Sequence, residues 1–68
     1  MKLTINGKEE EVNLSSDNTI MDLIELHRLN SQNIIVEHNQ QLYKEDRINK
    51  VFLSEGDNIE ILHFMGGG

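Results

Sequence analysis

The sequence predicts a small α+β domain in which one main helix packs on one face of a mixed sheet of four or five strands. Segments of alternating apolar and polar residues stand at both ends of the chain, and one stretch with helical periodicity lies between them. The 68 residues include no Pro and no Cys, so the chain has room for one domain and no disulfide to stabilise it. We place the domain at residues 1–65 and expect residues 66–68 to form a flexible C-terminal glycine tail.

The first two strands are predicted to form a hairpin. Leu3 and Ile5 alternate with polar neighbours, as in a strand with one buried face. Asn6-Gly7 follows, and both residues tolerate the positive φ of a type I′ turn. Residues 9–14 then begin with three glutamates and continue as a second alternating strand. We interpret the glutamates as a solvated edge, because charge protects exposed strand edges from pairing.

A helix is predicted from Ile20 to Leu29. Thr19 supplies a hydroxyl that can cap its first turn, and Asp22 places a negative charge near the positive end of the helix dipole. Arg28 is expected to complement the opposite end. The residues that share its apolar face are Ile20, Leu23, Ile24 and His27.

The second half of the chain contains the remaining strands. The β-branched run is predicted as a central strand, and the segment before the last strand as a short helical turn or loop anchored by Ile48. The predicted elements are the strand 34–38, the short strand 42–43, the turn or loop 44–50, the turn 54–57 and the last strand 58–64. A hairpin, then a helix, then further strands is the order of the β-grasp, or ubiquitin-like, arrangement.

Composition argues against several functional classes. Twelve acidic and six basic residues give a net charge of -6, which disfavours nucleic acid as a partner. No stretch is long and apolar enough to span a membrane, and no signal pattern opens the chain, so we expect a cytoplasmic protein without a membrane partner. His27, His38 and His63 have no partner at metal-ligand spacing, so no metal site is predicted. No glycine-rich loop precedes the helix to cradle a phosphate. We therefore expect neither an enzyme nor a bound cofactor.

The last strand carries the candidate docking surface. If Ile59 and Ile61 face the helix, alternation places Leu62 and Phe64 on the face that a single helix leaves uncovered. We predict that Leu62, Phe64 and the adaptable Met65 contact a partner protein. The alternative is that Leu62 or Phe64 curls over the edge of the sheet and belongs to the core.

The glycine run at the end of the sequence has two interpretations. Gly66, Gly67 and Gly68 can be an inert terminus or linker, because glycine-rich ends are commonly just that. They can also form a thread without side chains that presents the α-carboxylate of Gly68 to an enzyme.

The sequence resembles the ThiS family, the small sulfur carrier proteins of thiamine thiazole biosynthesis, over essentially its whole length. No single motif is specific, but their order together with the glycine ending is. His27 departs from the pattern, since the family usually has a bulky apolar residue there. The matching segments are Leu3-Thr4-Ile5-Asn6-Gly7-Lys8, Thr19-Ile20-Met21-Asp22-Leu23-Ile24, Ile35-Val36-Glu37-His38-Asn39, Glu55-Gly56-Asp57 and Ile59-Glu60-Ile61-Leu62-His63-Phe64-Met65-Gly66-Gly67-Gly68.

The resemblance implies chemistry at Gly68 and a substrate protein without catalytic residues of its own. A ThiF-like adenylating enzyme would use ATP to activate the Gly68 carboxylate. A persulfide made by a cysteine desulfurase would convert it to a thiocarboxylate, and a ThiG-like thiazole synthase would accept the sulfur. Gly66 and Gly67 would thread a narrow channel that excludes a Cβ.

Two alternatives share the same ending. One is a MoaD-like small subunit of molybdopterin synthase, although chains of that type are generally longer. The other is a ubiquitin-like module, either for interaction alone or for conjugation to lysine. The glycine residues do not discriminate among these alternatives, because all of them end in Gly-Gly.

Overall fold

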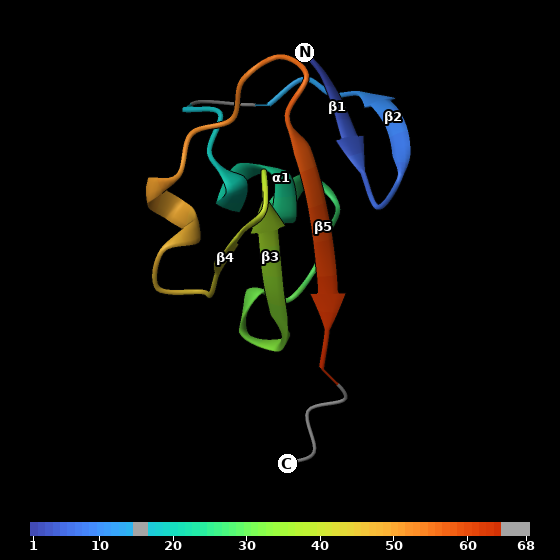
Figure 1. Ribbon diagram of the computed structural model, residues 1–68. Coiled ribbons are helices and arrows are strands. Elements are labelled where there is room, and N and C mark those ends of the chain that lie inside the picture. Colours follow the sequence, from blue (N-terminus) through green and yellow to red (C-terminus); the bar gives the residue numbers. More distant parts are fainter. Residues whose placement is uncertain (15–16, 65–68) are drawn as a thin grey trace.

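The computed structural model describes residues 1–14 and 17–64 and shows a five-stranded mixed sheet with one α-helix against it (Figure 1). The strand order is β2-β1-β5-β3-β4, with β5 parallel to β1 and antiparallel to β3. The predicted α+β architecture is confirmed. The elements are β1 (Lys2–Ile5), β2 (Lys8–Glu11), α1 (Ile20–Leu26), β3 (Ile34–His38), β4 (Gln41–Tyr43) and β5 (Asn58–His63).

The first hairpin forms as predicted, but its second strand is shorter. Asn6 and Gly7 both have positive φ, 51° and 83°, and β2 lies at the edge of the sheet. Just beyond the two strands, the N–H of Val12 donates to the carbonyl of Met1 at 2.9 Å. No residue of β1 lies opposite Asn13 or Leu14, so the prediction that the strand continues to Leu14 was wrong.

Helix α1 begins at a reciprocal cap. The N–H of Asp22 donates to the Thr19 hydroxyl, and the N–H of Thr19 donates to the Asp22 carboxylate, both at 3.2 Å. Each side chain therefore satisfies a backbone N–H that a helix N-terminus leaves without a partner. The predicted start of the helix is confirmed.

The helix ends at Leu26, three residues before the predicted Leu29. Arg28 has a φ of 58°, and its N–H donates to the carbonyl of Glu25 at 3.0 Å. The N–H of Leu29 donates to the carbonyl of Ile24 at 3.1 Å, which completes a Schellman motif. This motif satisfies the last carbonyls through backbone bonds. Arg28 therefore lies beyond the helix and not in its last turn.

The core lies between α1 and the sheet, and a short 3-10 helix at Ile48–Lys50 contributes Ile48 to it. Ile48 is fully buried, which confirms its predicted role as the anchor of the charged segment 44–50. The middle strand is β5 and not β3, although β3 is interior, between β5 and β4. The buried apolar residues are Leu3, Ile5, Val12, Ile20, Leu23, Ile24, Ile34, Val36, Ile48, Leu53, Ile59 and Ile61.

In the part of the chain that the structure describes, none of the helices has the length and apolar character needed to cross a membrane.

Candidate functional site at the end of strand β5

Strand β5 alternates between the core and solvent, and this alternation exposes Leu62. Ile59 and Ile61 are buried against the helix side, whereas Glu60 and Leu62 are exposed. Leu62 keeps 49% of its surface accessible and lies directly opposite Ile35 of β3. The prediction that Leu62 lies on the uncovered face of the sheet is confirmed.

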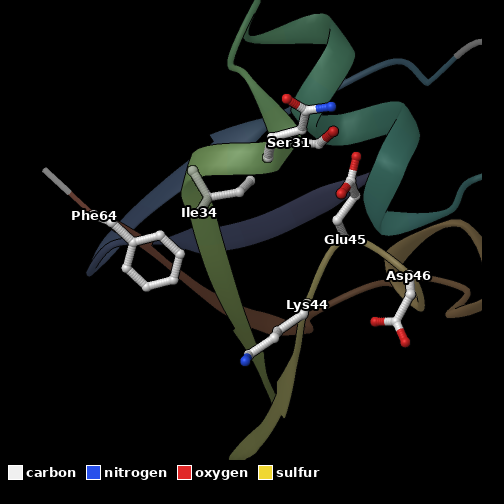
Figure 2. Close-up of a pocket in the computed structure, with 7 residues that line it drawn as sticks. Ser31, Ile34, Lys44, Glu45, Asp46 and Phe64 are labelled. Atoms are coloured by element: carbon white, nitrogen blue, oxygen red, sulfur yellow. The ribbon is translucent and has the colours of Figure 1, made fainter. Parts of the chain in front are cut away.

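Phe64 follows the strand and is also exposed, at 45%. Its N–H donates to the carbonyl of Asn33 at 2.9 Å, so the backbone here is held by the segment that precedes β3. The ring lies beside Ile34 at the rim of a groove of about 460 Å³ (Figure 2). The exposure predicted for Phe64 is therefore confirmed, although the domain already covers about half of the residue's surface. The groove is lined by Ser31, Gln32, Ile34, Lys44, Glu45, Asp46 and Phe64.

The rest of the predicted site follows Phe64 directly in the chain. Met65, predicted for docking, Gly66 and Gly67, predicted for threading, and Gly68, predicted as the modified residue, lie outside the described residues. The base of the predicted site is therefore the end of β5, which lies beside the start of β3 in Figure 1. The loop that leads into β5 lies at the opposite end of this strand.

A polar cluster occupies that other end of β5. His38 Nε2 lies 2.7 Å from Asp57 Oδ2, and the amide of Asn39 donates to Asp57 Oδ1 at 3.1 Å. The N–H of Ser54 donates to Asp57 Oδ2 at 2.9 Å, closing the turn in which Gly56 has a φ of 86°. Burial acts to raise the pKa of the Asp57 carboxyl, but the hydrogen bonds from these partners outweigh it and hold the pKa below its ordinary value. The cluster joins the β3–β4 turn to the loop before β5.

Sequence reasoning missed this cluster, and the chain gives no local signal for it. His38 and Asp57 are separated by 19 positions and meet only because β3 pairs with β5. The hydrogen bonds to Asp57 join the two turns, so we assign the cluster a structural role.

The histidines do not gather into a metal site. His27, predicted on the apolar face of the helix, is half-buried at the C-cap of α1, and its Nε2 lies 3.6 Å from Glu10 Oε1. His38 is engaged with Asp57, and His63 is exposed at the end of β5. Within residues 1–14 and 17–64, no three His, Asp or Glu side chains come together in a way that could hold a metal ion.

Known proteins resemble this chain over its whole length. The model of the ThiS family matches residues 3–68. The sulfur carrier protein ThiS of Bacillus subtilis (strain 168) is 40% identical over 66 residues, which is 97% of this chain and 98% of that protein. A thiazole synthase of Paramagnetospirillum magneticum (strain ATCC 700264 / AMB-1) is 37% identical over all 68 residues, although this chain spans only 20% of its length.

Solved structures agree with the sequence comparisons. The crystal structure of a thiamine biosynthesis protein (ThiS) from Geobacter metallireducens matches with a TM-score of 0.80 and 30% identity, covering 100% of both chains. The solution structure of a thiamine biosynthesis protein from the same organism gives 0.79 and 29%, covering 100% of this chain and 88% of that one.

Proposed function

This chain belongs to the ThiS family, the sulfur carrier proteins of thiamine biosynthesis, and we propose that Gly68 is the residue that carries the sulfur. The match to the sulfur carrier of Bacillus subtilis, which spans nearly the full length of both chains, carries the assignment. The exposed Leu62 and Phe64 support it, because they stand at the point where the chain continues toward Gly68.

The proposed reaction activates a carboxylate that is otherwise a poor electrophile. An α-carboxyl has a pKa of about 3.5, so it is ionised at neutral pH. A ThiF-like enzyme joins the Gly68 carboxylate to AMP from ATP and releases pyrophosphate. The terminal sulfur of a desulfurase-derived persulfide attacks the acyl carbon and displaces AMP. A thiol then cleaves the S–S bond, forming a disulfide and leaving the thiocarboxylate on Gly68.

A thiazole synthase is the proposed acceptor of that sulfur. The whole of this chain aligns with a fifth of the Paramagnetospirillum magneticum thiazole synthase, so a domain like this one occurs within a chain of that name. This supports the proposal that the carrier binds a thiazole synthase when it delivers its sulfur. In this scheme the chain is a substrate protein of the cytoplasm that binds no cofactor, and ATP is used by the adenylating enzyme.

Mass spectrometry of the protein purified from its own cells tests the proposal. We expect a fraction of molecules whose mass has changed by the exchange of one oxygen for one sulfur, located in the C-terminal peptide. Deletion of the adenylating enzyme should remove that fraction. Two growth conditions would reveal a MoaD-like role. In that case the sulfur at Gly68 would persist in cells supplied with thiamine, which do not need to make thiazole, and would disappear in cells that do not make molybdopterin. Unmodified protein accompanied by adducts to lysine would indicate a ubiquitin-like modifier.

The docking role of Phe64 can be tested by Phe64→Ala. Burying a whole Phe side chain contributes about 1.5–3 kcal/mol. Since 45% of Phe64 is exposed, roughly half of that remains for a partner, and we expect affinity for the adenylating enzyme to fall about three- to tenfold. Titration calorimetry measures the affinity.

Phe52→Ala is the matched control, because Phe52 is 63% exposed and lies in the segment before β5, whereas Phe64 follows β5. Its affinity should equal that of the wild type. An unchanged affinity for Phe64→Ala, together with a large loss of folding stability, would place Phe64 in the core and not at an interface.

A further inference from the structure

Two glutamates face each other across adjacent strands on the uncovered side of the sheet. Glu37 of β3 pairs in register with Glu60 of β5. Their neighbours Val36 and Ile61 are buried, so alternation turns both carboxylates away from the helix. Directly opposite residues have Cβ atoms about 4.5–5.5 Å apart, close enough for like charges to repel.

No ion pair within the described residues neutralises the charge of Glu37 or Glu60. The ion pairs within residues 1–14 and 17–64 use the carboxylates of Glu10, Glu11 and Asp57, and none uses Glu37 or Glu60. Like charges directly opposite in a sheet destabilise it. One cation placed over both carboxylates would relieve the repulsion expected from this register.

Apolar side chains border the glutamates on the same face. Ile35 lies opposite Leu62, one step along the strands, and Leu42 of β4 lies opposite Glu37. Leu42 and Leu62 are exposed at 64% and 49%. We call Ile35, Glu37, Leu42, Glu60 and Leu62 the Glu37–Glu60 face. Exposed apolar side chains can bury area against a partner, and charged side chains beside them can complement charges of opposite sign on that partner.

We propose that the Glu37–Glu60 face docks on the adenylating enzyme, where one Arg or Lys set among apolar side chains bridges the two carboxylates. The proposal rests on the proposed function. Leu62 belongs both to this face and to the end of β5, from which the chain continues to Gly68. The net charge of -6 makes a cationic partner surface complementary, and a guanidinium suits two neighbouring carboxylates.

Adenylation kinetics with the purified ThiF-like enzyme test the assignment. In pyrophosphate exchange, the double variant E37Q/E60Q should raise KM for the carrier about tenfold, equivalent to about 1.4 kcal/mol, with kcat unchanged. Its KM should also depend less on salt, because the charges that attract the enzyme are gone. E9Q is the matched control. Glu9 is exposed on the edge strand β2, opposite Thr4 of β1, and β1 separates β2 from β5. The KM of E9Q should stay within about twofold of the wild-type value.

Glu60→Lys separates docking from folding. The new ammonium can pair with Glu37 across the strands, so the urea midpoint of the free protein should rise. The same substitution presents a cation to the cationic enzyme surface, so KM should rise more than for E37Q/E60Q. If Glu60 affected only folding, the more stable Glu60→Lys variant would keep the wild-type KM.

Three outcomes would overturn the proposal. If E37Q/E60Q and Glu60→Lys keep the wild-type KM while the wild type is adenylated normally, the face does not dock on this enzyme and the proposed function stands. If the substitutions weaken only the binding of thiazole synthase, the face belongs to that enzyme. If the wild-type chain itself is not adenylated, the proposed function fails and the docking proposal fails with it.

Discussion

A chain extended by one residue after Gly68 is expected to lose ATP-dependent adenylation while keeping its fold and its docking. The extra residue moves the terminal carboxylate by up to about 3.3–3.6 Å along an extended chain. Reacting groups displaced by about 1 Å can already lose about a hundredfold in rate, so the shifted carboxylate should not react measurably. Pyrophosphate exchange reads out activation, and calorimetry with the same enzyme measures docking.

Gly67→Ala provides a second test with the carboxylate left at its normal position. A Cβ thickens the chain and restricts φ where we propose that it threads a narrow channel, so adenylation should be slower at unchanged binding by the folded domain. The decisive contrary result is an extended chain that is adenylated and thiocarboxylated at the wild-type rate. Gly68 would then have no special position, and the chain would be an interaction module.

Asp57→Asn should destabilise the domain more than any other exchange of a carboxylate for an amide within the described residues. The Asp57 carboxylate accepts hydrogen bonds from His38, Asn39 and the Ser54 N–H. An amide loses the charge and turns an NH₂ group toward one of these donors. Hydrogen bonds to charged groups contribute about 1.5–3 kcal/mol each, so we expect a loss of roughly 2–3 kcal/mol in urea unfolding at neutral pH. Asp46→Asn, at an exposed position in a turn, is the control and should change stability by less than about 0.5 kcal/mol.

The effect of Asp57 should depend on pH in a defined direction. Its pKa is lower in the folded protein than in the unfolded chain, so the folded state favours the ionised form. That stabilisation is fully present above the ordinary Asp pKa of about 3.9 and is lost as pH falls through the folded-state value. The stability difference between wild type and Asp57→Asn should therefore shrink below about pH 4. A difference that stays constant down to pH 2 would show that the carboxylate charge contributes nothing.

The sequence correctly predicted those elements whose conformation is set by residues a few positions apart in the chain. Asn6-Gly7 predicts a hairpin because both residues accept positive φ, and Thr19 with Asp22 predicts a helix start because their side chains reach backbone N–H groups three positions away. Alternation along β5 likewise predicted the exposure of Leu62, since one buried face turns every second side chain outward.

The boundaries that were wrong depend on partners elsewhere in the chain. The second strand stops at Glu11 because β1 has no residue opposite Asn13 or Leu14. The residues 9–14 themselves contain no information about the length of β1. The helix stops at Leu26 because Arg28 adopts a positive φ, a conformation for which its residue type gives no warning.

The candidate site divides in the same way. The glycine ending and the apolar residues before Gly66 are properties of the sequence alone, and the resemblance to the ThiS family turned them into the carrier hypothesis. That Glu37 faces Glu60, and that His38 meets Asp57, was decided only by the register of β3 against β5. Pairing between strands is set by packing of the whole core and not by neighbours along the chain, because a shift of one residue would turn each buried side chain outward. Such contacts therefore carry no local signature, and only the tertiary structure brings their charges together.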